Sequence, residues 1–248
     1  MDELTRLFVL FGVGVIAGVM NVMAGGGSSL SLPILIFMGL DSAVANGTNR
    51  IAIFIQNIAA ILSFRQQKFH QFTTSLKMAV WTLPGGIIGA LVAIRISDEW
   101  FQRILAVVLL GVILSMLIPQ NYTTQPQDSL SGWKRFLIYP ALFGIGFYGG
   151  FIQVGVGFLL MAALYHLLRV NLVVVNMHKV FIVFIYTVPA LAIFIFSGNV
   201  DWILGLSLAA GNSLGGWWAA RLSVKKGEKI IRWILFLALM IMAYKLFR

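Results

Sequence analysis

The stretch NVMAGGGSSLSLP, residues 21–33, places three consecutive glycines inside an uncharged apolar run that covers residues 7–40. A run of this length can cross the roughly 30 Å hydrocarbon core of a bilayer, for which a helix needs about 17–25 residues. In hydrocarbon, unwound backbone is tolerated only where protein, water or a bound solute satisfies its hydrogen bonds. The glycines therefore indicate a membrane helix that is interrupted at a special position.

The composition is that of a polytopic membrane protein. Of the 248 residues 60% are hydrophobic and 10% are charged, and the mean hydropathy is +0.93, whereas soluble domains are about 45–50% apolar. A net charge of +10 would suggest nucleic acid as the partner of a soluble protein. Here Lys and Arg fall in short clusters between apolar runs, as in loops that face anionic lipid. We expect a multi-pass protein of the cell membrane, with the lipid bilayer and not nucleic acid around it.

Ten apolar segments follow one another, and all are expected to be helices because lipid-embedded backbone must satisfy its own hydrogen bonds. They cover residues 6–23, 28–40, 43–64, 73–95, 101–118, 134–152, 157–168, 173–196, 202–223 and 230–247. A polar connector, residues 119–132, separates an N-terminal transmembrane repeat (1–118) from a C-terminal one (133–248). The predicted fold class is an all-α polytopic membrane protein with two repeats of about five hydrophobic segments each.

A shift of 130 residues aligns the two halves without a gap. The special residues stay in register: Gly25 and Gly27 fall on Gly155 and Gly157, Asn46 falls on Asn176, and Gly85 and Gly86 fall on Gly215 and Gly216. This coincidence is the evidence for an internal repeat, because an apolar alphabet alone gives chance matches.

The distribution of Lys and Arg predicts that the repeats are inverted. Arg221, Lys225 and Lys226 put one loop of the second half in the cytoplasm by the positive-inside rule, so the turn one helix earlier lies outside. In the first half the equivalent of that outside turn carries Arg65 and Lys68. Corresponding loops thus lie on opposite sides of the membrane.

Membrane segments that are broken by glycine at matching positions of two halves point to the substrate site of a transporter. We predict one glycine-broken helix in each repeat, at residues 25–27 and 155–157. The short helix that starts at Ser28 would present free N–H groups and a positive dipole end to an anion. The alternative is close packing, in which glycines such as Gly14 and Gly18 only let helices approach one another.

A second polar constellation lies near the start of the second segment after each break, residues 43–64 and 173–196. The first half has Asn46, Thr48, Asn49 and Arg50, and the second half has Asn176, His178 and Lys179. Ionisable groups inside a membrane span usually face the bundle interior or a water-filled cavity. Two cations without nearby carboxylates need an anion. The alternative is that both side chains snorkel to an interface.

Five further amides lie in apolar surroundings, namely Asn21, Gln56, Asn57, Gln153 and Asn212. Each is interpreted as a partner in an interhelical hydrogen bond. Asn21 and Gln153 are stronger candidates for ligand contacts than the others, because each precedes a glycine break by two to four residues. The predicted substrate-binding set is Asn21, Gly25, Gly26, Gly27, Ser28, Asn46, Thr48, Asn49, Arg50, Gln153, Gly155, Gly157, Asn176, His178 and Lys179.

The residues that are missing exclude other classes of protein. All eight acidic residues lie at predicted segment ends or in loops, so a proton-coupled cation transporter is not favoured. Paired carboxylates, a His-rich metal set and a Walker-type phosphate loop are absent. We therefore predict no enzyme activity, no catalytic residue, no metal and no cofactor.

The glycine and asparagine pattern also resembles a known family. Gly18, Gly25-Gly26-Gly27-Ser28-Ser29, Pro33, Gly39 and the run from Ala43 to Asn49 are similar to the TauE/SafE family of sulfite exporters and toluene-sulfonate uptake permeases. The resemblance covers nearly the whole chain and implies a small integral carrier of sulfur-containing or related organic anions. The second half departs from the pattern, since Gly155-Val156-Gly157 lacks the third glycine and Arg50 has no repeat partner.

Together these observations predict a secondary transporter of small sulfur-containing or organic anions, working by alternating access around a site at the membrane midplane. A small-anion channel and a non-transporting membrane scaffold or subunit are the alternatives. The sequence leaves open which anion is carried, the direction, the coupling ion and whether the chain forms a homo-oligomer.

Overall fold

The computed structural model describes residues 2–117, 136–168 and 170–227, and in these ranges all regular structure is helical. The helices are α1 (Glu3–Met23), α2 (Ser28–Phe37), α3 (Ser42–Gln66), α4 (Phe72–Ala93), α5 (Asp98–Leu117), α7 (Ile138–Phe151), α8 (Val156–Leu168), α9 (Leu172–Phe196) and α10 (Trp202–Lys226). The all-helical prediction is confirmed for this part of the chain. The predicted connector 119–132 and the last segment, 230–247, lie outside the described residues.

Helix boundaries follow the 130-residue offset between the halves. The helix α3 begins at Ser42 and α9 at Leu172, and each has 25 residues. The next pair, α4 and α10, begins at Phe72 and Trp202, again 130 residues apart. Asn171 caps the start of α9 by accepting a hydrogen bond from the N–H of Val174, as its side chain is suited to do.

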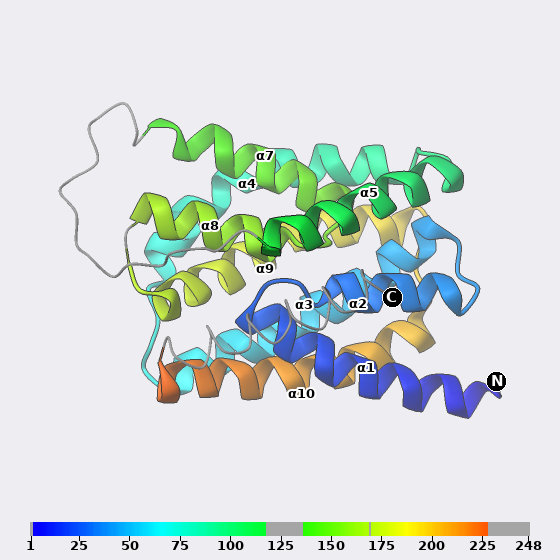
Figure 1. Ribbon diagram of the computed structural model, residues 1–248, viewed down its shortest axis with the longest axis horizontal. Coiled ribbons are helices and arrows are strands. Elements are labelled where there is room, and N and C mark those ends of the chain that lie inside the picture. Colours follow the sequence, from blue (N-terminus) through cyan, green and yellow to red (C-terminus); the bar gives the residue numbers. More distant parts are fainter. Residues whose placement is uncertain (1, 118–135, 169, 228–248) are drawn as a thin grey trace.

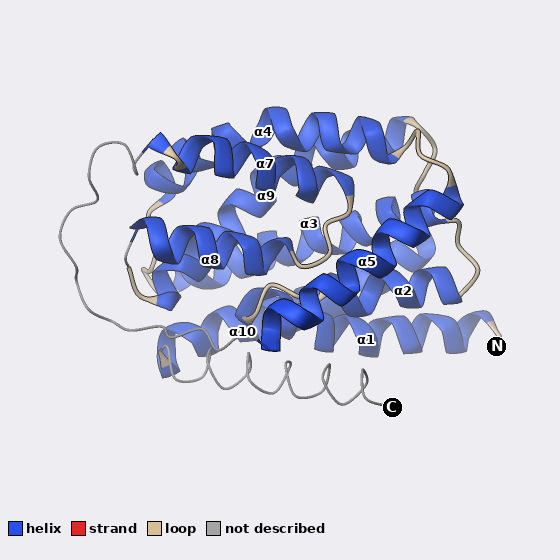
Figure 2. Ribbon diagram, turned by 45° about the horizontal axis from the view of Figure 1, so that its top comes forward, coloured by secondary structure: helices blue, strands red, loops and turns tan. Residues whose placement is uncertain are grey.

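Each half opens with a helical hairpin. Residues 24–27 turn the chain so that α2 runs back toward the end from which α1 came, and residues 152–155 do the same between α7 and α8 (Figures 1 and 2). The two hairpins enter from opposite ends of the molecule, with α1 running from right to left in Figure 1 and α7 from left to right. The equivalent helices α3 and α9 also run in opposite directions. The interruption thus reverses the chain.

The halves exchange their first helices. The helix α1 packs along α10 of the second half, and α7 packs along α4 of the first half. Glycine makes both approaches close, since a methyl group on Gly14 would lie 2.5 Å from the carbonyl oxygen of Leu208, and one on Gly85 would lie 2.2 Å from that of Phe143. The packing interpretation of Gly14 and Gly18 is correct for these residues.

The surface is apolar and the interior holds charges, as expected for a protein in lipid. Phe8, Ile16 and Leu214 are more than half exposed, whereas Arg50 and Lys179 are 0% and 2% exposed. Three of the helices, α1, α4 and α9, are long and apolar enough to cross a membrane. The described part of the chain therefore includes helices that are able to span a membrane.

Candidate functional site

The turns of the two hairpins touch each other. Gly25 and Gly155, which are equivalent in the repeat, have φ angles of +89° and +72°, a conformation that glycine adopts without steric strain. A methyl group on Gly25 would lie 2.3 Å from the carbonyl carbon of Gly157, so the contact is backbone to backbone. Gln153 has a φ of +62° in the turn that lacks a third glycine. We call residues 24–27 and 152–155, with Gly157, the hairpin tips.

Arg50 of α3 holds the end of α7. Its Nη1 atom donates to the carbonyl oxygen of Gly149 at 3.1 Å, and its Nη2 atom donates to the carbonyls of Gly150 and Phe151. These are the last carbonyls of α7, which have no partner inside the helix and carry its negative dipole end. Nη1 also donates to Oε1 of Gln153 at 3.0 Å.

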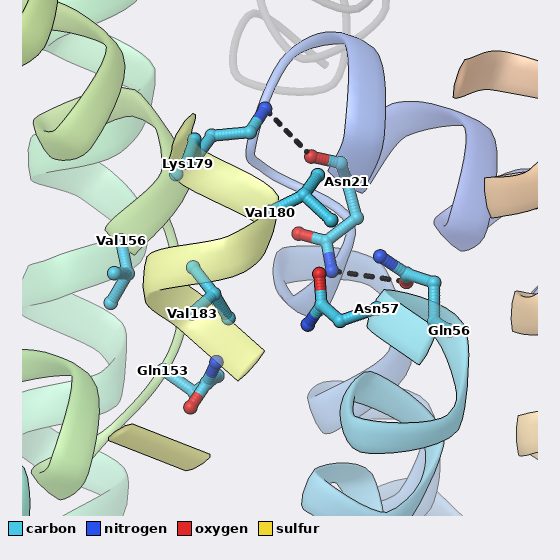
Figure 3. A pocket seen from close by; sticks show the side chains of 9 residues that line it. Asn21, Gln56, Asn57, Gln153, Val156, Lys179, Val180 and Val183 are labelled. Carbon is cyan, nitrogen blue, oxygen red and sulfur yellow. Dashed lines mark hydrogen bonds between the residues drawn. The ribbon is translucent and has the colours of Figure 1, made fainter. Parts of the chain in front are cut away.

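Lys179 of α9 does the same for α1 (Figure 3). Its Nζ atom donates to the carbonyl oxygens of Asn21 and Val22, at 3.1 and 2.7 Å. The third contact of Nζ is the Sδ atom of Met161 at 3.6 Å. A cation of each half thus caps the hairpin of the other half.

These contacts settle the alternative of snorkelling. Both cationic groups are buried and bonded to helix ends near the hairpin tips, so neither Arg50 nor Lys179 reaches an interface. The carbonyls also correct one step of the sequence argument. Two cations without carboxylates do not by themselves require an anion, because the ends of α1 and α7 supply partial negative charge.

A small cavity lies between the halves beside the tips. Its volume is about 10 Å³, room for about one water molecule. Its polar lining consists of Lys179 and four amide side chains, those of Asn21, Gln56, Asn57 and Gln153. Figure 3 shows Asn21 between Lys179 and Gln56, with a 3.1 Å hydrogen bond from its Nδ2 atom to Oε1 of Gln56.

Several buried polar atoms near the start of α2 and on α3 and α9 have no hydrogen-bond partner among the described residues. Those that belong to the predicted site amides and serine are Oγ of Ser28, Nδ2 of Asn49 and both amide atoms of Asn176. All three residues are at most 1% exposed. A buried polar group without a partner is unfavourable by roughly 1–3 kcal/mol, so these atoms suit a polar solute.

The remaining predicted site residues have contacts of their own. Asn46 donates to the carbonyl oxygen of Phe151 at 2.7 Å and so joins Arg50 at the end of α7. Thr48 accepts from the N–H of Asp201 at the start of α10, and His178 bonds to Ser75 in the first turn of α4 through Nδ1 at 2.8 Å. Thr48 and His178 therefore hold the beginnings of α10 and α4.

Gln56 and Asn57 line the cavity although the sequence analysis left them out of the site. Their residue type was the signal, since two consecutive amides occur in an otherwise apolar run. Gln56 does accept an interhelical hydrogen bond, as predicted for it. The bond does not exclude a place in the cavity lining, which the sequence argument treated as the alternative.

The fold and the family comparison define the class of this protein as a membrane transporter. The chain matches the family described as "Sulfite exporter TauE/SafE" over residues 10–246. It therefore belongs to the TauE/SafE family, as its glycine and asparagine motifs indicated.

Curated relatives agree with this class. A "Probable membrane transporter protein" of Haemophilus influenzae is 27% identical over 226 residues, which is 91% of this chain and 88% of the relative. "Probable membrane transporter protein ORF9" of a Sinorhizobium species is 28% identical, covering 97% of this chain and 92% of the relative. "Probable membrane transporter protein YfcA" of Escherichia coli K12 is 28% identical, with 97% and 89% covered. No solved structure matches the chain at a significant level.

Proposed function

We propose that this protein is a secondary transporter of small sulfur-containing or organic anions, such as sulfite or sulfonates, and works by alternating access. One observation carries the proposal. Two hairpin tips meet in the interior, the side chains of Arg50 and Lys179 are buried and bond to the helix ends beside them, and Ser28, Asn49 and Asn176 are buried with polar atoms that have no partner among the described residues. The described acidic residues all lie outside this interior, so the local charge favours an anion.

The anion would bind at the tips, where α2 and α8 begin. Helix N-termini present N–H groups and a positive dipole end to an anion. The unpartnered atoms of Ser28, Asn49 and Asn176 would replace part of its hydration shell, with Lys179 as the cation that lines the cavity. Arg50 and Asn46, which hold the end of α7, would keep the second tip in place.

Inverted repeats are the second part of the proposal. The opposite directions of α1 and α7, and of α3 and α9, support it (Figure 1). So does the charge of the two ends. In the described part, one end carries Arg65, Lys68, Lys77, Arg221, Lys225 and Lys226 and no acidic residue. The other end carries three arginines, Arg6, Arg95 and Arg103, beside Asp2, Glu3, Asp41, Asp98, Glu99 and Asp201. By the positive-inside rule the first end faces the cytoplasm of an inner or plasma membrane.

A carrier is favoured over an open channel by the size of the cavity. A space of about 10 Å³ holds about one water molecule, so an anion enters only when the tips move apart. The two repeats, residues 1–118 and 133–248, would rock against each other around the tips, and each would expose the site to one side of the membrane.

Asn176 and Asn212 provide the test, because both are buried amides whose two polar atoms have no partner. Asn176→Leu should abolish the uptake of labelled sulfite and methanesulfonate into proteoliposomes. Asn212→Leu, at the packing face between α10 and α1, should keep that uptake. Neither substitution removes a hydrogen bond, so both proteins should stay folded.

Purified protein should also be stabilised against heating by the anion that it carries, because a ligand bound only to the folded state raises stability by mass action. Uptake by Asn176→Leu at the rate of Asn212→Leu would remove Asn176 from the site. A protein that neither takes up nor is stabilised by any sulfite, sulfonate or carboxylate in a panel would refute the proposed function.

A further inference from the structure

We propose that Lys179 carries the coupling proton of the transport cycle, so that one proton moves with each monovalent anion. In this cycle Lys179 is a neutral amine when no anion is bound and becomes an ammonium when the anion arrives. The inference rests on the proposed function, and it adds the coupling ion and the residue that binds it.

The hydrogen bonds of Lys179 match a neutral amine. A neutral amine has two N–H donors and an ammonium has three. The Nζ atom has two oxygen acceptors, the carbonyls of Asn21 and Val22, at 3.1 and 2.7 Å. Its third neighbour is Sδ of Met161 at 3.6 Å, and a thioether is a weak acceptor. A third proton therefore lacks a strong acceptor until an anion enters the adjoining cavity.

The side chains that face Lys179 supply no negative charge. From α3 the cavity receives the amides of Gln56 and Asn57, and from α1 that of Asn21. From α8 Lys179 meets Met161. The end of α1 supplies only partial negative charge, and a buried full charge without a counter-ion is strongly unfavourable, so an arriving anion favours proton uptake.

The other ionisable groups nearby act in the same direction or are engaged elsewhere. Arg50 donates to Gln153, which lines the same cavity as Lys179, so its permanent positive charge disfavours a second one there. The hydroxyl of Tyr186 accepts from Gln153. His178, next to Lys179 in sequence, bonds to Ser75.

The two basic side chains therefore have different roles. The guanidinium of Arg50 stays protonated under all physiological conditions, and it bonds to three backbone carbonyls at the end of α7. An amine can gain and lose a proton, and Lys179 is the cation that borders the cavity. Arg50 is the permanent cap and Lys179 the exchangeable one.

The cycle balances in atoms and charge. On one side of the membrane the neutral amine of Lys179 takes a proton from water and binds one anion, which gives an ammonium–anion pair with no net charge. On the other side both are released and the amine returns neutral. No unpaired charge crosses the hydrocarbon in either direction, which avoids the large penalty for a bare charge there.

The test uses proteoliposomes, radiolabelled methanesulfonate and a pH-sensitive dye trapped inside. Methanesulfonate stays ionised, so it carries no proton itself. The wild type should acidify the interior as it accumulates the anion. Lys179→Arg keeps a donor to the carbonyls of α1 but cannot release a proton. It should lose net uptake by about tenfold or more, because its return step moves a bare charge, while anion-for-anion exchange persists. Lys225→Arg, an exposed change on α10, should match the wild type.

If sulfite alone is carried, the dye signal is corrected with protein-free vesicles, because sulfite is itself a weak acid. Wild-type uptake without acidification would overturn the coupling role while leaving anion transport intact. Proton-coupled net uptake by Lys179→Arg would overturn it too. Loss of both exchange and net uptake in Lys179→Arg, with thermal stability preserved, would make Lys179 a binding residue only. Absence of wild-type uptake and binding for every anion would instead refute the proposed function.

Discussion

Arg50 shows how a single side chain can complete a helix in the membrane. The carbonyls of Gly149 and Gly150 would otherwise lie unpaired in the interior, and the guanidinium reaches both of them, and the carbonyl of Phe151 that Asn46 also binds, from α3. The Cζ atom of Arg50 also lies 4.7 Å from the ring centre of Phe194, which is a cation–π contact. The Arg50 side chain is thus held both by the backbone carbonyls of α7 and by the ring of Phe194.

Replacing Arg50 should destabilise the protein strongly. Arg50→Met leaves several carbonyls of α7 without a donor, and we expect a loss of about 3 kcal/mol, or roughly 10 °C in the unfolding midpoint of the purified protein. Arg50→Lys, which keeps a charge and fewer donors, should lose less. Arg103→Met is the control, because Arg103 is 61% exposed in its pair with Glu99 and such pairs contribute less than about 1 kcal/mol. Equal midpoints for Arg50→Met and Arg103→Met would contradict the capping role.

The sequence allowed Arg50 and Lys179 to be selected as interior cations, because charged residues are rare inside apolar segments. Their partners could not be predicted. Arg50 bonds to carbonyls 99–101 residues away, and Lys179 to carbonyls more than 150 residues away. Backbone carbonyls carry no sequence signal, so from the sequence only an anion could be expected as the source of the missing negative charge.

At the scale of the element, the hairpin tips leave no room for a side chain at their glycines. Gly25 combines a positive φ angle with direct backbone contact to Gly157. A side chain there is strained by both features, and no rearrangement of a flexible neighbour can relieve a clash with backbone. We therefore expect each tip to keep its backbone conformation and to move only as a rigid unit.

Gly25→Ala should lower thermal stability and transport together, because the added methyl group would lie 2.3 Å from the carbonyl carbon of Gly157. Gly12→Ala is the matched control in α1, since a methyl group at Gly12 would meet nothing within 4 Å. It should be neutral or stabilise by up to about 1 kcal/mol through helix propensity. The measurements are the unfolding midpoint and the initial rate of anion uptake. A stable Gly25→Ala protein with normal uptake would show that the tips do not need close contact.

The start of α3 depends on a residue of α5. Asp98 accepts a hydrogen bond from the N–H of Ser42 at 2.6 Å, and the side chain and the backbone N–H of Ser42 together lower the pKa of Asp98 below its ordinary value of 3.8. A carboxyl with a lower pKa in the folded state stabilises the fold above its unfolded pKa, and the contribution disappears as the pH falls through the folded pKa.

Asp98→Asn should therefore lower the unfolding midpoint at neutral pH, by an amount near the lower limit for helix caps, about 0.5 kcal/mol, because Asp98 is exposed. The difference from the wild type should shrink below about pH 4. Unfolding midpoints between pH 3 and 8 measure this. A difference that grows toward acid would have the wrong sign. Glu99→Gln, at the neighbouring exposed position, is the control.

Most helix positions could be predicted from the sequence, since apolar segments in lipid have no alternative to helix. The cap of α9 at Asn171 follows the rule for its residue type, whereas Asp41, the equivalent residue before α3, makes no side-chain cap hydrogen bond. The reversal at residues 24–27 could not be predicted, because glycines interrupt a helix without fixing the direction in which the chain continues. The sequence likewise did not indicate which helices of the two halves would pack together.

At the scale of the whole molecule, the charged ends predict an orientation in the membrane that can be measured. The natural chain has no cysteine, so single cysteines report on one position each. Gln66→Cys places a cysteine at the end of α3, at the same end of the molecule as Arg65 and Lys68. Ser197→Cys places one at the opposite end, after α9. Both positions are exposed.

A membrane-impermeant maleimide added to intact cells should label Ser197→Cys and not Gln66→Cys, and inside-out vesicles should reverse the pattern. Labelling of both from the same side would contradict the proposed orientation and the inverted arrangement with it. Permeabilised cells, in which both positions must react, provide the control for reactivity.

The mutual capping of the hairpins has a consequence for biosynthesis. The first hairpin leaves the ribosome with the carbonyls of Asn21 and Val22 unpaired, and Lys179 is synthesised more than 150 residues later. The second hairpin, in contrast, finds Arg50 already made. Insertion by the translocon must therefore tolerate an unfinished N-terminal half, and a chain cut between the halves should regain its fold only when both pieces are made in the same cell.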